Sequence, residues 1–209
     1  MILDTQLELL PWESHVGTGI GGVPPTSYGT RQLGLATEFF TSGPPYADWL
    51  AAVHRPVLPN SGGLSLSFIL ATDSSTPDDA QALEFDTRLS IGNWNYNFSS
   101  QFNYQEGGMW QIIDRASHWA DTGFKPGKFA PGTPYRIRID YQFSTASRIG
   151  SILGIRLNDQ RFLVPTTMQN LPPTLLNWAD SASLQIQLDL NSSGGAYSIY
   201  LRDIQYEWS

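Results

Sequence analysis

Hydrophobic and polar residues alternate with a period of two along most of the chain, and helical periodicity is scarce. Strict alternation is typical of β-strands that bury one face. The alternating segments predict twelve strands: Leu3–Leu9, Gln32–Phe40, Asp48–Val53, Leu64–Ala71, Ala82–Ile91, Trp94–Tyr104, Met109–Arg115, Tyr135–Phe143, Ile152–Asn158, Arg161–Val164, Ser183–Leu190 and Tyr197–Trp208. The first and third of these are the least regular, and the Leu-rich start of the chain also fits a short helix.

Turn-forming clusters rich in Gly, Pro, Asn and Ser separate these segments, and none is long enough to be an interdomain linker. We therefore expect a single domain over residues 1–209. Twelve strands exceed what one open sheet holds without curling or splitting, so two stacked sheets are expected. The predicted fold class is all-β, a two-sheet antiparallel β-sandwich of the jelly-roll type.

The segment 83–104 shows the alternation most clearly, and its phase inverts at Gly92 and Asn93. A two-residue Gly-Asn turn explains the inversion, because Gly supplies the positive φ that a primed hairpin turn requires. A slip of one residue would turn one strand's polar set toward the core, so the pattern predicts the register as well. The predicted pairs match in polarity: Ile91 with Trp94, Leu89 with Tyr96, Thr87 with Phe98, Leu83 with Phe102, Ser90 with Asn95, Arg88 with Asn97, Asp86 with Ser99 and Glu84 with Gln101.

One face of this predicted hairpin carries amides, hydroxyls and acids in place of the usual exposed strand residues. Asn is depleted in strands, so a row with Asn95 and Asn97 goes against local propensity, as functional surfaces often do. Sugar hydroxyls need hydrogen-bond donors and acceptors together, which amides and carboxylates supply. The face is a candidate carbohydrate-binding site, with an ordinary solvated surface as the alternative. Its candidate ligand-binding residues are Glu84, Asp86, Arg88, Asn95, Asn97 and Gln101.

Two further predicted strands show the same alternation. In one strand the polar members are Gln185, Gln187 and Asp189. In the other they are Arg136, Arg138 and Asp140. If these rows share the face of the hairpin, they form a broad groove rich in amides and charge, whereas salt bridges and solvation are the alternative. Gln185 and Gln187 are included among the candidate ligand-binding residues.

Composition and charge exclude several kinds of chemistry. The chain of 209 residues has no cysteine, which excludes a disulfide framework, a thiolate zinc site, an iron–sulfur cluster and a cysteine nucleophile. Lys125 and Lys128 are the only lysines among 12 basic residues, against 19 acids and a formal net charge of −7. This balance offers no electrostatic footprint for nucleic acid or anionic lipid. It is compatible with a neutral, polyhydroxylated ligand.

The chain lacks the patterns of membrane and targeting segments. No run approaches the 18 apolar residues of a spanning helix, so we expect no membrane insertion. The start of the sequence has neither a basic n-region nor an apolar h-region. We expect a secreted or extracellular protein whose signal peptide is absent from this sequence.

The tripeptide Glu84-Phe85-Asp86 places two carboxylates on one strand face, about 7 Å apart at a rise of about 3.4 Å per residue. At this motif the chain resembles the concanavalin A-like lectin and glucanase sandwiches. In the laminarinase-type glycoside hydrolases of that group, a Glu-x-Asp-x-(x)-Glu strand supplies the nucleophile, an assisting acid and the general acid/base. Glu84 and Asp86 match the first two positions. Arg88 or Leu89 stands at the third, and neither can act as the general acid.

The chain is also similar to bacterial extracellular sandwich domains of the same superfamily. The similarity includes Trp-Ala-Asp-Thr-Gly at residues 119–123 and the closing Tyr-Glu-Trp at residues 206–208. The resemblance implies a degenerate glucanase-like site kept for binding, and hence a lectin-like carbohydrate-binding domain. The alternative is a glycoside hydrolase or polysaccharide lyase of jelly-roll fold with Glu84 and Asp86 as catalytic residues. They would then act with an acid from another strand: Glu106, Asp114 or Asp189. An adhesion or assembly domain with an ordinary polar surface is a third interpretation.

Tryptophan rings that pack against the apolar face of a pyranose are further candidates. Trp110 and Trp119 stand near glycine-containing loops and are predicted to contact ligand, with Trp178 as a weaker candidate, whereas parity assigns Trp94 to the core. No cofactor is expected. The three histidines occur singly and the acidic loop 73–79 lacks EF-hand spacing, so metal content is undetermined and a structural calcium ion stays open.

Overall fold

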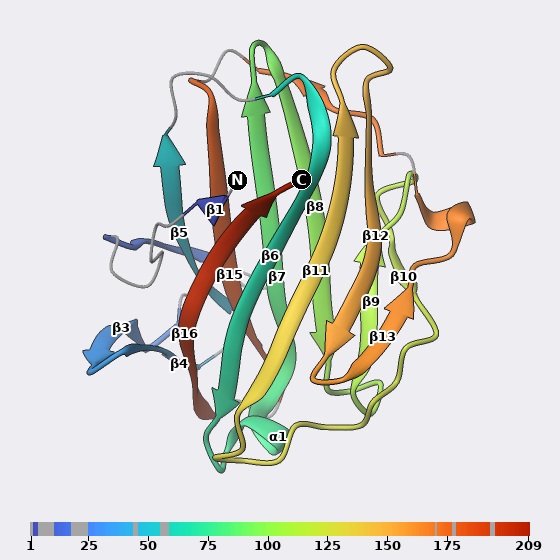
Figure 1. The fold of residues 1–209 in the computed structure, drawn as a ribbon. Coiled ribbons are helices and arrows are strands. Elements are labelled where there is room, and N and C mark those ends of the chain that lie inside the picture. Colours follow the sequence, from blue (N-terminus) through green and yellow to red (C-terminus); the bar gives the residue numbers. More distant parts are fainter. Residues whose placement is uncertain are drawn as a thin grey trace.

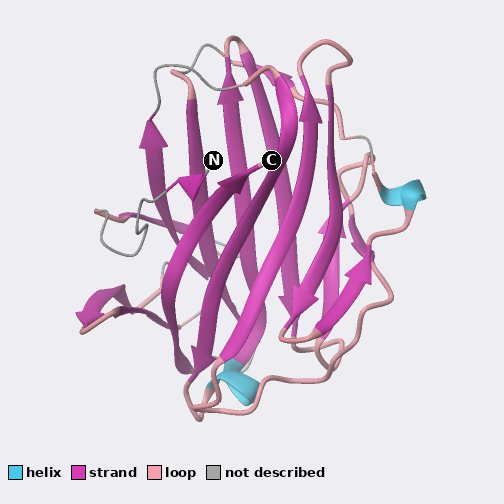
Figure 2. Cartoon of the chain, viewed as in Figure 1, coloured by secondary structure: helices cyan, strands magenta, loops and turns pink. Residues whose placement is uncertain are grey.

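The computed structural model describes residues 2–3, 11–17, 25–43, 46–54, 59–169, 171–176, 179–192 and 195–209. Almost all of the regular structure in these residues is β-strand (Figure 2). The strands form two antiparallel sheets that face each other across a hydrophobic core (Figure 1). This arrangement confirms the predicted two-sheet antiparallel sandwich.

The first sheet consists of β1 (Ile2–Leu3), β3 (Ser27–Leu33), β4 (Ala36–Ser42), β6 (Ser61–Thr72), β11 (Tyr135–Ser144), β12 (Ile149–Leu157), β13 (Gln160–Leu163) and β16 (Ala196–Trp208). Their order is β13-β12-β11-β6-β16-β4-β3, and β1 pairs with β16. The long strands β16, β6 and β11 lie at the front in Figure 1. The outer face of this sheet is therefore the one turned toward the viewer.

The second sheet lies behind the first and consists of β2 (Glu13–Gly17), β5 (Tyr46–His54), β7 (Ala80–Ile91), β8 (Trp94–Asn103), β9 (Met109–Ile113), β10 (Trp119–Asp121), β14 (Thr174–Leu175) and β15 (Ser181–Leu190). Their order is β10-β9-β8-β7-β15-β5-β2, and β14 pairs with β8. The predicted hairpin is β7–β8, at the centre of this sheet.

Helical structure in the described residues is confined to short turns. The helix α1 (Thr76–Asp79) connects β6 to β7, and a 3-10 helix (Thr166–Met168) follows β13. None of the helices in the described ranges is long and apolar enough to cross a membrane.

Aromatic rings fill much of the space between the sheets. The ring centroid of Phe85 lies 4.8 Å from that of Phe68 in the first sheet and 6.4 Å from that of Trp110. The core also contains a hydrogen bond between the sheets, in which Thr87 Oγ1 donates to Tyr141 Oη at 3.0 Å. Because side chains alternate along a strand, the polar residues between these core positions lie on the outer faces of the sheets.

The β7–β8 hairpin has the predicted register at every pair. Ile91 pairs with Trp94 and Leu83 pairs with Phe102, and Gly92 in the turn has a φ of +58°. The sequence pattern therefore predicts both the pairing and the separation of the polar and apolar faces correctly.

The structure differs from the sequence prediction mainly at the ends of the chain and in short strands. The prediction of one strand over Gln32–Phe40 is wrong, because β3 ends at Leu33 and β4 begins at Ala36, with Gly34 at a φ of +62° between them. The short strands β2, β10 and β14 were not predicted. Most of the predicted strand Leu3–Leu9 lies outside the described residues.

Candidate functional site

A row of polar side chains crosses the outer face of the second sheet from β2 to β10. Each member is the cross-strand partner of the next, so neighbouring side chains in the row lie side by side on one face. The row consists of His15, Asp48, Gln187, Glu84, Gln101, Gln111 and Asp121. Glu84 is at the centre of this row, and Gln187 and Gln101, which also belong to the predicted site, lie on either side of it.

Hydrogen bonds among amide and carboxyl groups join members of this row to one another and to Asp189. Gln187 Nε2 donates to Glu84 Oε1 at 3.0 Å and to Asp189 Oδ1 at 2.9 Å. On the other side of the hairpin, Gln101 Nε2 donates to Gln111 Oε1, and Gln111 Nε2 donates to Asp121 Oδ1. These bonds orient the amide groups, because each amide offers a defined donor side and a defined acceptor side.

Further candidate residues lie in the neighbouring rows of the same face. Gln185 is the cross-strand partner of Asp86, and Arg88 is the partner of Asn97. Asn95, which accepts a hydrogen bond from Ser90 Oγ at 3.2 Å, lies one row further along the hairpin. The structure thus brings these candidates together on one face: Glu84, Asp86, Arg88, Asn95, Asn97, Gln101, Gln185 and Gln187.

The arginine-containing row predicted in the segment 135–143 is on the other sheet. Arg138 and Asp140 belong to β11, and their cross-strand partners in β6 are Ser67 and Ser65. They therefore face outward from the first sheet. A single groove that combines this row with Glu84 is excluded by the topology.

The two tryptophans predicted to contact ligand differ in their placement. Trp110 is wholly buried between the sheets, with its ring packed against Phe85 and Phe102, so the prediction of a ligand contact there is wrong. Trp119 is half-buried in the edge strand β10 and pairs with Ile113, on the outward-facing side. Trp178 lies outside the described residues.

Several polar side chains of this outer face are buried, although they do not point into the core. The exposed fraction is 6% for Asp86, 5% for Gln101 and 5% for Ser99. An ordinary solvated sheet face leaves such side chains exposed to water. Burial makes each hydrogen bond here more important, because an unpaired polar group away from water costs free energy.

Glu84 and Asp189 form a pair of hydrogen-bonded carboxyl groups. Burial is the main cause that raises the pKa of Glu84, and the negative charges of Asp189 and Asp86 raise it further. Burial also raises the pKa of Asp189, while its hydrogen bonds with Glu84 and Gln187 act in the opposite direction. Glu84 is therefore the protonated partner at neutral pH, and it donates its hydrogen bond to the Asp189 carboxylate.

Asp86 is the second acid of the Glu-x-Asp motif. Burial raises its pKa to about 7, against the opposing effects of Arg88 and of hydrogen bonds from Ser99 and Ser100. Its Oδ1 atom has no hydrogen-bond partner among the described residues. Burial thus favours the protonated form of Asp86, and the unpartnered Oδ1 atom is itself buried.

Of the three acids considered as partners for Glu84, the structure brings one to it. Asp189 contacts Glu84, whereas Asp114 Oδ1 accepts hydrogen bonds from the backbone of Ala116 and His118 and closes a turn. Glu106 is exposed in the turn after β8. Four members of the row were not among the predicted site residues: His15, Asp48, Gln111 and Asp121. Asp48 and Gln111 alternate with core residues in predicted strands, and this parity was the signal available.

Metal-ligating groups do not gather in the described part of the chain, where no three His, Cys, Asp or Glu side chains are placed to hold an ion. In the acidic loop considered for calcium, Asp73 Oδ1 accepts hydrogen bonds from Thr76 N and Oγ1, and its Oδ2 accepts one from Ser198 N. Asp73 thus connects the loop to β16.

Comparisons with known proteins find similarity in structure but none in sequence. No model of a known protein family matches the sequence, and no curated protein matches it. Among solved structures, alginate lyase vAL-1 from Chlorella virus is similar over 100% of both chains, with 10% identity and a TM-score of 0.56. Peanut lectin is similar over 95% of this chain and 99% of its own, with 9% identity and a TM-score of 0.49.

The carbohydrate-binding module CBM66 from Bacillus subtilis is similar over 94% of both chains, with 4% identity and a TM-score of 0.45. The likeness to the alginate lyase extends over the whole chain and confirms the predicted jelly-roll sandwich fold. At 10% identity it shows the fold alone.

Proposed function

We propose that this protein binds a neutral carbohydrate on the outer face of the second sheet. The observation that carries the proposal is the row of amides and acids that crosses this sheet from His15 to Asp121. Amide and carboxyl groups at neighbouring positions match the vicinal hydroxyls of a sugar, which act as both donors and acceptors. Binding through these side chains requires no cofactor.

The protonation of Glu84 supports a neutral ligand. A neutral carboxyl group donates and accepts hydrogen bonds, as an amide does, whereas a carboxylate only accepts. Glu84, Gln187 and Gln101 therefore form a stretch of uncharged groups with both capacities. At the edge of the sheet, the half-exposed ring of Trp119 is placed to pack against a sugar ring.

The fold agrees with this proposal without assigning a ligand. Alginate lyase vAL-1, which is named for its action on alginate, has the same fold over its whole length. A jelly-roll sandwich is therefore compatible with a polysaccharide ligand. We place the proposed function outside the cell, where neutral polysaccharides are abundant, and detection of the native protein in the medium of its source cells tests this placement.

Affinity electrophoresis in gels containing soluble β-glucan, mannan, xylan or galactan tests the binding function. Gln185→Ala and Asn97→Ala remove amides from the proposed face, and we expect each to weaken the retardation that the wild type shows. Gln142→Ala is the matched control, because Gln142 is an exposed glutamine on the outer face of the first sheet. Absence of retardation by every polysaccharide, or equal losses in Gln185→Ala and Gln142→Ala, would rule out this site.

A second candidate function is hydrolysis or lyase cleavage of a polysaccharide, and the raised pKa of Glu84 favours it. A carboxyl group that is protonated at neutral pH can deliver a proton to a leaving oxygen. Asp189 is too close to flank the same bond, because it is hydrogen-bonded to Glu84. Asp86 lies about 7 Å from Glu84 along the strand, and this separation of two carboxyl groups is typical of inverting glycosidases.

Release of reducing or unsaturated sugar ends from the same polysaccharides distinguishes the two candidates. Glu84→Gln removes the acidic proton but keeps the shape of the side chain. Product formation by the wild type that is lost in Glu84→Gln supports catalysis. Binding by both proteins without product formation supports the binding function.

A further inference from the structure

A hollow lies on the outer face of the first sheet, on the opposite side of the molecule from Glu84. Its volume is about 380 Å³, and three arginines line it: Arg136 and Arg138 of β11 and Arg156 of β12. Asp203 is the acidic residue in its lining. The hollow thus concentrates positive charge in a chain whose formal net charge is −7.

The register of the strands places these arginines in an unfavourable arrangement. Arg156 is the direct cross-strand partner of Arg138 on one side and of Arg161 on the other. Like charges directly opposite each other destabilise a sheet. Residues that are placed at a cost to the stability of the fold often belong to a functional surface.

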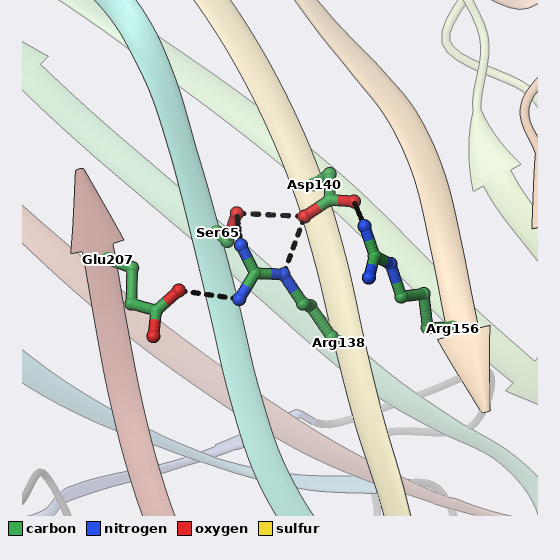
Figure 3. A network of polar contacts seen from close by, with 5 residues as sticks. All are labelled: Ser65, Arg138, Asp140, Arg156 and Glu207. Carbon is green, nitrogen blue, oxygen red and sulfur yellow. Dashed lines mark hydrogen bonds and ion pairs between the residues drawn. The ribbon is translucent and has the colours of Figure 1, made fainter. Parts of the chain in front are cut away.

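Acidic neighbours compensate this charge only in part (Figure 3). Arg138 donates hydrogen bonds to Asp140, Glu207 and Ser65. Arg156 Nη2 lies 3.6 Å from Asp140 Oδ2, and 44% of its side-chain surface is exposed. The Arg136 side chain forms no ion pair within the described ranges and is exposed. Arg136 and Arg156 therefore retain donors for a ligand.

The positions of the three arginines suit a single anionic group. Arg136 lies two residues from Arg138 on the same strand face, about 7 Å away. Arg156 on β12, which is the direct partner of Arg138, is the diagonal neighbour of Arg136. Long guanidinium side chains from such positions can converge on one oxyanion. The planar guanidinium fork binds carboxylate and sulfate oxygens through paired hydrogen bonds.

The remainder of the lining supplies groups that recognise hydroxyls. Asn158 lines the hollow, and its Oδ1 accepts a hydrogen bond from Arg136 N, a bond that does not use its amide donors. Ser67 and Gln205 also line the hollow. Ile69 adds an apolar surface. A phosphate or sulfate ion alone would use the arginines but not these neighbours.

We propose that this hollow binds an acidic sugar unit of a polysaccharide, through the carboxylate or sulfate group that the sugar carries. Arg136 and Arg156 bind the oxyanion, Arg138 is held beneath it by Asp140 and Glu207, and the amides contact the ring hydroxyls. This site is separate from the neutral-carbohydrate face of the second sheet, and it does not depend on that proposal.

Binding of dextran sulfate, polygalacturonate and unmodified dextran, measured by biolayer interferometry at about 100 mM salt, tests the proposal. We expect binding of at least one acidic polymer and none of dextran. Arg136→Gln and Arg156→Gln should each weaken the affinity about tenfold or more, because each removes hydrogen bonds to a charged group. Arg115→Gln, which removes one charge from an exposed position beyond β9, should change the affinity less than twofold.

Each contrary outcome overturns the proposal. Failure of both acidic polymers to bind excludes the site. An equal loss in Arg115→Gln shows attraction by overall charge, and equally tight binding of duplex DNA or of inorganic sulfate shows a general anion site with no sugar recognition. Melting curves of the variants verify that the exposed substitutions leave the fold intact. The neutral-polysaccharide experiment uses other variants, so either proposal can fail while the other stands.

Discussion

The hydrogen bond that protonated Glu84 donates to Asp189 leads to a specific prediction for the variant Glu84→Gln. Protonated Glu84 donates to Asp189 and accepts from Gln187 Nε2 at 3.0 Å. A glutamine side chain has the same shape and can make both bonds, with its amide donating to Asp189 and its carbonyl accepting from Gln187. The substitution therefore keeps the hydrogen bonds and removes only the ability to ionise.

The size of the effect follows from the linkage between protonation and folding. In the unfolded chain a glutamate ionises near pH 4.3, whereas burial keeps Glu84 protonated in the folded protein at higher pH. The folded state then binds more protons than the unfolded state, so its stability falls as pH rises above about 4.3. The loss is about 1.4 kcal/mol per pH unit, or about 2–3 kcal/mol between pH 5 and pH 7.

Urea denaturation at pH 5, 6, 7 and 8 measures this loss. The wild type should lose about 2–3 kcal/mol more than Glu84→Gln between pH 5 and pH 7, equivalent to a difference of about 5–10 °C in melting temperature. Asp86 and Asp189 contribute to the pH dependence of both proteins, so the difference isolates Glu84. Glu106→Gln is the control, because Glu106 is an exposed glutamate in a turn.

Parallel stability curves for the wild type and Glu84→Gln would contradict the reasoning. They would mean that Glu84 is ionised in the folded protein, and the hydrogen bond to Asp189 would then be absent. A Glu106→Gln curve with the slope of Glu84→Gln would show that the effect comes from overall charge instead.

Three further substitutions test other parts of the structure. Thr87→Val removes the buried hydroxyl that donates to Tyr141 Oη at 3.0 Å and should cost about 1–3 kcal/mol in urea denaturation, and an unchanged midpoint would contradict that bond. Trp110→Ala should cost about 3–5 kcal/mol, because the ring is wholly buried, whereas full stability would place the ring outside the core. Gly108→Ala should cost at least about 2 kcal/mol in the same assay, because Gly108 has a φ of +82° and a Cβ would lie 2.4 Å from the backbone of a neighbouring loop. A cost below 0.5 kcal/mol would show that the loop can move away.

The sequence pattern predicted the centre of the second sheet because local chemistry determines it. The Gly92 turn and the inversion of polarity around it define one hairpin register, and the structure has that register at every pair. Neighbours that are close in sequence and joined by a two-residue turn leave few alternatives. The sandwich fold followed from the number of such segments.

The remaining features depend on contacts between distant segments, which alternation alone does not specify. The pattern predicted the polar row of β15 but not its partner, and β15 inserts beside β7 after about 90 intervening residues. Trp110 stands between Met109 and Gln111 in a short strand, at a position that fits either face, and packing against Phe85 determines its burial. The edge strand β10 has three residues, too few for a periodic signal.

The two outer faces of the sandwich differ in the charge that they present, and this difference determines which class of ligand suits each face. On the second sheet, burial keeps a proton on Glu84, so the centre of the face presents uncharged groups that donate and accept. On the first sheet, Arg138 forms ion pairs with Asp140 and Glu207, while Arg136 and Arg156 stay exposed beside it. A neutral sugar would gain little from the exposed arginines of the first sheet. An acidic sugar bound to the second sheet would meet the acidic groups of Asp86 and Asp189. One chain can thus hold two carbohydrate sites of different charge without competition between them.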